Sequence, residues 1–341
     1  MPIRPELRRR GALLAASLVC IALCAGCGEV HARTELGPAR PLTVSIDGSP
    51  SGLYAALYTA AADGDFADGA LAVTIRHPPG GDPLHSLAAG SAGVAIVSEA
   101  ALLSARDRGA QVVAIGALVG QPLDGIVSVP PRQVTTAGAL AGATVALAPT
   151  PLASAELETA VSSVQPPPAH VRRLVVAGDL AAPLRNRRAT AALGGPWPVE
   201  VAELQLAERR TSVMQIQQAG VPTFAQLVIA VSVAEAHRDG PLLRAFLQSL
   251  TRGERATRAD PGAAAAILVR ADPRLNAGLE RRVVALTLPL TVSPTPGEPF
   301  GYQDPFAWRA FGAWMLAHGL LHTRFDAGLL ITDEFLPGAG A

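Results

Sequence analysis

The feature that most constrains the fold is a repeated alternation of short apolar segments with helical ones. Strand patterns occur at residues 42–46, 71–75, 94–97 and 112–119, and helical patterns lie between them at 53–62, 82–90 and 99–108. Strands that alternate with helices predict a parallel α/β sheet.

The alternation begins again after residue 120. This second unit has predicted strands at 126–129, 144–147, 174–176 and 189–193, and a helix at 154–163. An apolar strand at 227–233 then leads into a mainly helical region, with helices predicted at 241–250, 261–269, 279–286 and 304–318. Two α/β units, the first completed by C-terminal helices, place a cleft at the carboxyl ends of the strands, where ligands bind in such sheets.

The N-terminus predicts export. Arg8, Arg9 and Arg10 precede an apolar run, which predicts a secretory signal over residues 1–26 and is too short to span a membrane. The run ends at Cys27 in a Cys-Ala-Gly-Cys sequence that resembles a bacterial lipobox and predicts lipidation of Cys27. The alternative is cleavage nearby and a freely secreted protein. Residues 27–40 show no periodicity and are interpreted as a tether.

Composition excludes several function classes. The chain has no Lys, which excludes a Schiff-base, pyridoxal-phosphate or P-loop lysine. Without the four Arg and one Glu of the signal there remain 24 Arg and 27 acidic residues, a net charge of −3 that does not favour nucleic acid. All three Cys lie within the first 27 residues, and the seven His form no ligand pattern. We therefore expect no cofactor and no metal.

Several motifs carry a resemblance to a known family. They are Asp47-x-x-Pro50 before Gly52-Leu53-Tyr54, Gly80-Gly81-Asp82-Pro83-Leu84, Val94-Ala95-Ile96, Pro299-Phe300-Gly301-Tyr302-Gln303-Asp304-Pro305, and Thr332-Asp333-Glu334-Phe335-Leu336-Pro337. In this order and spacing they resemble the periplasmic binding proteins for thiamine pyrimidine precursors, aliphatic sulfonates and nitrate. The resemblance covers nearly all of the chain from residue 42 onward.

The resemblance implies a type II periplasmic-binding fold, with two α/β lobes, a hinge and an interlobe ligand cleft. The expected crossings lie near Gly120 and Phe224, so that residues 41–119 and 225–341 form lobe 1 and residues 120–224 form lobe 2. The implied role is that of a monomeric, extracytoplasmic solute-binding lipoprotein, and not an enzyme. Because the chain has no nucleotide motif, the energy for import would come from partner permease and ATPase subunits.

The implied ligand is a small heteroaromatic compound such as a thiamine pyrimidine precursor. The pyrimidine-binding branch carries Trp, Asn and His in a longer loop after the motif Asp, whereas residues 48–52 form a shorter loop here without these side chains. Riboflavin, aliphatic sulfonates and nitrate stay open as ligands, although no cleft Arg stands out for an anion. A secreted enzyme or a non-transport sensor on the same fold is the alternative of another class.

Trp197 and Glu200 match an aromatic residue followed by Glu in the family. An indole stacks on a flat ring, and a carboxylate accepts from a ring amine. Trp197 is placed in a Gly/Pro loop by the sequence, and its alternative role is to anchor that loop.

The other candidate ligand contacts follow strand ends or open helices. They are Asp47, Ser49, Ser51, Tyr54, Gly81, Asp82, Ser98, Glu99, Thr150 and Ser154. Three of them have a structural alternative: Asp47 as a partner of its own turn, Asp82 as a helix N-cap and Glu99 as a complement to a helix dipole. Thr150 and Ser154 open a lobe 2 helix, where backbone amides bind polar groups.

Overall fold

The computed structural model describes residues 38–78 and 81–338, and residues from 38 onward belong to one compact unit. The predicted signal, the lipid site at Cys27, most of the predicted tether and Gly80 lie outside the described residues. Among the helices that are described, none combines the length and apolar character needed to cross a membrane.

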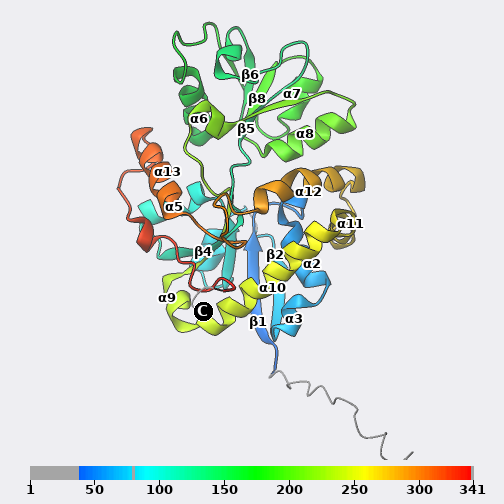
Figure 1. The fold of residues 1–341 in the computed structure, drawn as a ribbon, viewed down its shortest axis with the longest axis vertical. Coiled ribbons are helices and arrows are strands. Elements are labelled where there is room, and N and C mark those ends of the chain that lie inside the picture. The colour runs from blue at the N-terminus through cyan, green and yellow to red at the C-terminus, as the bar shows by residue number, and fades with distance from the viewer. Residues whose placement is uncertain (1–37, 79–80, 339–341) are drawn as a thin grey trace, which may run out of the picture. The chain divides into compact units, whose positions relative to one another are not determined.

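The first lobe is built on a five-stranded sheet in the order β2-β1-β3-β10-β4. Figure 1 labels β1, β2 and β4 of this sheet. Its strands are β1 (Arg40–Ile46), β2 (Leu71–Arg76), β3 (Val94–Val97), β4 (Val112–Val119) and β10 (Leu227–Ser232). β1 pairs in parallel with β2 and β3, whereas β10 is antiparallel to both β3 and β4. The sheet is therefore mixed and not parallel throughout as predicted, because β10 lies between β3 and β4 and runs in the opposite direction.

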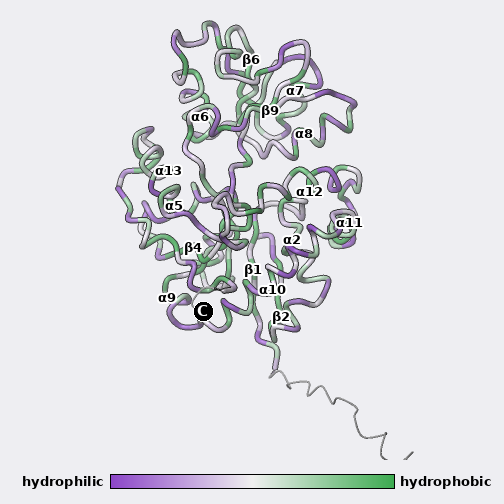
Figure 2. Tube along the Cα trace, viewed as in Figure 1, coloured by the Kyte–Doolittle hydropathy of each residue, from purple (hydrophilic) through white to green (hydrophobic). Residues whose placement is uncertain are grey.

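Helices surround this sheet. They are η1 (Gly52–Tyr54), α2 (Ala55–Ala62), α3 (Asp65–Asp68), α4 (Pro83–Ala88), α5 (Glu99–Asp107), α9 (Val233–Arg238), α10 (Gly240–Ala259), α11 (Pro261–Ala271), α12 (Ala277–Thr291), α13 (Pro305–Ala317) and η4 (Ala327–Leu329). Every residue of β3 and β4 is buried. Figure 2 shows hydrophobic residues along the inner strands and hydrophilic ones on helix faces and loops.

The second lobe repeats the plan with the sheet order β7-β6-β8-β5-β9. Its elements are β5 (Gly125–Ser128), η2 (Ala137–Leu140), β6 (Thr144–Leu147), α6 (Pro151–Ser162), β7 (Arg172–Val175), α7 (Ala181–Arg185), β8 (Ala191–Leu193), α8 (Trp197–Leu206), β9 (Ser212–Gln215) and η3 (Ile216–Ala219). β5 is antiparallel to β8 and β9, while β6 is parallel to β7 and β8. This sheet is also mixed rather than parallel.

Two segments link the lobes. Residues 120–124 connect β4 to β5, and residues 220–226 lead back from η3 to β10. In each case the strand after the crossing inserts antiparallel between two strands of its new sheet. The fold is thus the two-lobed α/β architecture of periplasmic binding proteins, as predicted.

The C-terminal helix α13 contacts the second crossing and helix α6 of lobe 2. Phe311 of α13 stacks on Phe224 of the second crossing, with ring centroids 4.3 Å apart. Trp314, one turn further along, donates from Nε1 to Thr159 Oγ1 of α6 over 3.1 Å. His318 lies 3.1 Å from the same hydroxyl through Nε2. Aromatic packing and a shared hydroxyl therefore join a lobe 1 helix to a lobe 2 helix.

Candidate functional site

Trp197 is the first residue of α8, not part of a loop as the sequence predicted. Pro196 stands at the N-cap and Pro198 inside the first turn, where a missing N–H costs nothing, so the Gly/Pro-rich stretch begins a helix. The Trp197 N–H donates to the Leu123 carbonyl of the first crossing over 2.8 Å. A Cβ on Gly125 would lie 3.2 Å from Trp197 Cδ1, so the indole lies directly against the start of β5.

Glu200, one turn after Trp197, is a buried carboxyl. Glu200 is 5% exposed, and its Oε2 has no hydrogen-bond partner among the described residues. Burial, reinforced by the charge of Asp124, raises the pKa of Glu200 to about 8. The indole Nε1 of Trp197 is buried and equally lacks a described partner.

Lobe 2 has two further buried carboxyls, which the sequence did not indicate, and the charge of one of them, Asp124, acts on both Glu200 and Glu156. Asp124 ends the first crossing, is 6% exposed, and burial raises its pKa to about 7. Glu156 of α6 is fully buried, neither carboxyl oxygen has a partner in the described part of the chain, and burial together with the charge of Asp124 raises its pKa well above the usual range. We call Asp124, Glu156 and Glu200 the acidic cluster of lobe 2.

Helical spacing was the one signal that could have revealed Glu156. It stands on the buried face of α6 with Ala153, Leu157 and Ala160. A carboxyl on an apolar helix face is expensive to bury without a partner, which makes it a candidate for a functional role.

In lobe 1 five of the predicted contacts lie on two neighbouring loops and the start of η1. The Tyr54 hydroxyl donates to the Asp47 carbonyl over 3.2 Å, and burial raises the pKa of Tyr54. A Cβ on Gly81, whose φ is +69°, would lie 2.9 Å from Asp47 Oδ1, so the two loops approach closely. Ser51 caps η1 by accepting from the Leu53 N–H. Ser49 and the Asp47 side chain are exposed beside them.

The same loop has polar partners that the sequence did not indicate. The Tyr58 hydroxyl lies 3.1 Å from His77 Nε2, and His77 Nδ1 contacts the Gly48 carbonyl. Since a carbonyl only accepts, Nδ1 carries a proton, and in the neutral ring Nε2 then accepts from Tyr58. Burial raises the pKa of Tyr58 to about 12, so this hydroxyl stays a donor.

The N-terminal amide of η1 is already occupied by the protein itself. The Gly52 N–H donates to Glu280 Oε2 of α12 over 2.7 Å. Glu280 is 4% exposed, and burial raises its pKa while the Gly52 hydrogen bond lowers it. An internal carboxyl therefore takes the place that an anionic ligand would use at this helix start.

Several predicted contacts serve as helix caps. Asp82 accepts from the His85 N–H over 3.1 Å, and Ser98 accepts from the Ala101 N–H over 3.1 Å. In lobe 2, Thr150 accepts from the Ala153 N–H over 3.2 Å. The helix begins at residue 151 rather than 154, so Ser154 lies in its first turn and donates back to the Thr150 carbonyl over 3.2 Å.

Glu99 stands in the first turn of α5, and one of its two carboxyl oxygens is held by the second crossing. Oε2 accepts from the Ala225 N–H over 2.7 Å, and the Glu99 N–H donates to the Ala225 carbonyl over 3.3 Å. The side chain is fully buried, and burial raises its pKa to about 8. Glu99 thus fastens α5 to the second crossing.

The described residues contain no group of three or more His, Cys, Asp or Glu side chains placed to hold a metal ion.

Residues 53–264 match the model of the NMT1/THI5-like family. The chain belongs to this family. It is 26% identical over 322 residues to the formylaminopyrimidine-binding protein of Halalkalibacterium halodurans, covering 93% of this chain and 97% of that one. It is also 30% identical over 139 residues to the riboflavin-binding protein RibY of Chloroflexus aurantiacus, covering 40% of each.

Solved structures share the fold. The periplasmic aliphatic sulphonate binding protein SsuA of Escherichia coli superposes with a TM-score of 0.66 at 15% identity, covering 87% of this chain and 98% of that one. The desulfurization enzyme DSZB does so with a TM-score of 0.57 at 14% identity, covering 87% and 97%. These findings confirm the predicted family and its role as a solute-binding protein of an ABC importer, and at the level of the family they support a binding protein rather than an enzyme.

Proposed function

We propose that the protein captures a small aminated heteroaromatic compound of the thiamine pyrimidine precursor class, against Trp197 and Glu200, and delivers it to an ABC permease. The observation that carries this proposal is the set of unsatisfied buried hydrogen-bonding atoms at the start of α8. Glu200 Oε2 and Trp197 Nε1 both lack partners among the described residues. A buried polar atom without a partner is costly, and a bound ligand removes that cost.

The chemistry of an aminopyrimidine suits this pair. Its ring nitrogen accepts and its exocyclic amino group donates, side by side. Because the pKa of Glu200 is raised to about 8, its carboxyl is mostly protonated near neutral pH. A protonated carboxyl donates from O–H and accepts at its other oxygen, which matches both groups at once. The indole of Trp197 offers a face or an edge to the flat ring.

The electrostatics argue against sulfonate and nitrate. An anion beside Glu200 would approach the acidic cluster of lobe 2 rather than a cation. Arg185, which faces Glu203 of α8, is already paired with Asp179 and Glu203. The protonated carboxyls of the cluster supply no cation to balance an anion in a buried site, so the cluster favours a neutral ligand that forms hydrogen bonds.

The comparisons support the same ligand class. The relative that spans nearly the whole chain is named for binding formylaminopyrimidine, and the riboflavin-binding relative, which covers 40% of the chain, makes a second flat heteroaromatic compound the alternative ligand. We further propose that the protein is a monomer held outside the cell membrane by a lipid on Cys27, with permease and ATPase subunits as its partners. A secreted enzyme or a sensor on this fold stays the competing hypothesis.

A thermal-shift and calorimetric titration tests the proposal. The purified protein is mixed with formylaminopyrimidine, thiamine, riboflavin, taurine and nitrate. A ligand that binds only the folded state adds about 2.7 kcal/mol of stability at a hundredfold excess over its Kd. We expect a shift with formylaminopyrimidine.

Two variants and a matched control locate the site. Glu200→Met removes the carboxyl at similar volume, and Trp197→Leu removes the ring; we expect each to weaken binding by about tenfold or more. Glu203→Gln, on the same helix, is expected to bind like the parent protein. A shift with taurine or nitrate instead would refute the proposed ligand class, and binding that survives both variants would refute the proposed site.

A further inference from the structure

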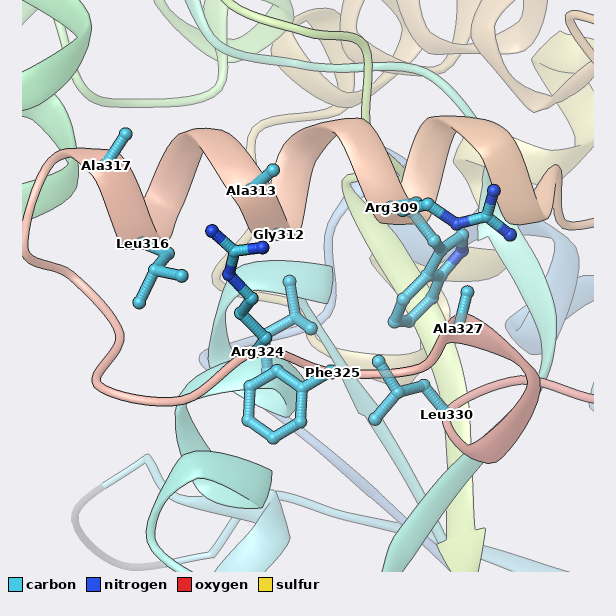
Figure 3. Close-up of a pocket in the computed structure, with 11 residues that line it drawn as sticks. Arg309, Gly312, Ala313, Leu316, Ala317, Arg324, Phe325, Ala327 and Leu330 are labelled. Carbon is cyan, nitrogen blue, oxygen red and sulfur yellow. The ribbon is translucent and has the colours of Figure 1, made fainter.

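A cavity lies in lobe 1, and neither Trp197 nor Glu200 lines it. It has a volume of about 580 Å³ and opens between α13 and the segment 324–330, with α5 beneath (Figure 3). This volume lies within the range of about 300–1,000 Å³ typical of small-molecule sites. Neither the proposed pyrimidine site nor any predicted contact residue lines it.

The cavity exists because α13 presents small residues to this segment. Gly312 and Ala313 face the space, and a Cβ added to Gly312 would meet nothing within 4 Å. The walls are apolar and rigid: Leu103 is fully buried, and Trp308 and Leu330 are each 2% exposed. Such walls favour a ligand with an apolar body.

Two guanidinium groups stand beside the cavity. Figure 3 shows Arg324 reaching from its segment toward α13 beside Gly312 and Ala313, while Arg309 projects from α13 itself. Arg309 lies over the ring of Phe306, with Cζ 5.4 Å from the ring centroid. Within the described residues neither arginine pairs with a carboxylate. Two such cations beside an apolar cavity are complementary to an anion on an apolar ligand.

The acidic side chains nearby are engaged elsewhere. Asp107 of α5 accepts hydrogen bonds from the backbone N–H groups and side chains of His322 and Thr323. Asp326 caps η4 by accepting from the Gly328 N–H over 3.0 Å. These contacts leave the two guanidinium groups as the charged groups that line the cavity.

We propose that this cavity binds an anionic amphiphile, a small molecule with an apolar chain or ring system and one carboxylate or sulfonate group. The apolar part lies between α13 and the segment 324–330 against Trp308, and the anionic group contacts Arg324, while Arg309, which lies over Phe306, adds positive charge at the rim. This is a second ligand site, independent of the proposed pyrimidine site.

The test is calorimetric titration of the full-length protein with decanoate and, separately, with decanesulfonate and decanol below their aggregation concentrations. We expect saturable 1:1 binding of both anions and binding of decanol that is at least about tenfold weaker. Arg309→Gln with Arg324→Gln should weaken the anions by about tenfold or more and leave decanol unchanged. Arg270→Gln, an exposed arginine on α11, serves as the matched control.

Variants that fill the cavity with a larger side chain test whether decanoate binds inside it. Gly312→Leu places a side chain into open space on a helix, so the fold is retained while the site is blocked. Ala313→Leu is a second blocking variant that serves the same purpose. We expect both to abolish decanoate binding and to leave the thermal shift with formylaminopyrimidine intact.

Three results would overturn the proposal. One is an absence of decanoate binding to the parent protein. Another is decanoate binding that survives Gly312→Leu and Ala313→Leu in folded protein. Loss of decanoate binding in Trp197→Leu would count equally, because it would assign decanoate to the proposed pyrimidine site. The third is concentration-dependent dimerisation that Gly312→Leu abolishes, since the cavity would then belong to an interface between two copies.

Discussion

Replacing Glu99 by Gln should change how stability depends on pH. Glu99 is fully buried, holds the Ala225 N–H through Oε2, and has no described partner for Oε1. Its pKa is raised from 4.5 to about 8, chiefly by burial. The folded protein therefore retains a proton that the unfolded chain releases. Stability is greatest below about pH 4.5 and is lost as pH rises toward 8.

The magnitude follows from the size of the shift. Where the group is protonated in the folded state and ionised in the unfolded state, stability falls by about 1.4 kcal/mol for each pH unit. Between about pH 5 and about pH 7 this amounts to about 2.5 kcal/mol from Glu99 alone. Glu99→Gln keeps an oxygen that accepts from Ala225 but does not titrate. Between about pH 5 and about pH 7, the free energy of unfolding of the variant should therefore rise by about 2.5 kcal/mol relative to that of the parent protein.

Urea unfolding of both proteins at about pH 5, 6 and 7 measures the effect. The difference between the two free energies of unfolding is the relevant quantity, because the acidic cluster of lobe 2 titrates in both proteins and cancels. Asp304 and Tyr302 line the same small cavity as Glu99 and are also common to both. Glu158→Gln, which removes an exposed carboxyl of α6, should follow the parent profile. Parallel profiles for Glu99→Gln and the parent, within about 0.5 kcal/mol, would refute the assignment of a raised pKa to this carboxyl.

Three further substitutions test the packing by urea unfolding. Gly253→Ala on α10 should cost about 2 kcal/mol or more, because the new Cβ would collide with the Ala56 carbonyl of α2; an unchanged midpoint would contradict the close approach. Gly312→Ala, with open space around the same new methyl, should raise stability by about 0.5–1 kcal/mol through helix propensity, and a loss would contradict the cavity. Thr159→Val should cost about 1–2 kcal/mol because it leaves Trp314 Nε1 without an acceptor between the lobes; a neutral result would show that water replaces the hydroxyl.

The sequence predicted the elements whose signals are local. The strands at 42–46, 94–97 and 112–119 were found because their apolar patterns are continuous over a few residues. Asp82 was identified as a cap because a capping residue followed by Pro is a short-range pattern. Helix α8 was missed because Gly-Gly-Pro-Trp-Pro favours a loop locally, although Pro is also well suited to a helix start.

Contacts between distant segments were decided only by the tertiary structure. The antiparallel insertion of β5 and β10 follows from each strand arriving through a crossing, which no local pattern encodes. The acidic cluster gathers one carboxyl from a crossing and two from helices α6 and α8, at positions where burial, rather than residue type, raises the pKa. Glu99 gained its role from Ala225, 126 residues away in the chain. Sequence patterns thus determined the order of the elements and the family, because both are written in local spacing. Burial and long-range contact determined which carboxyls lack hydrogen-bond partners among the described residues.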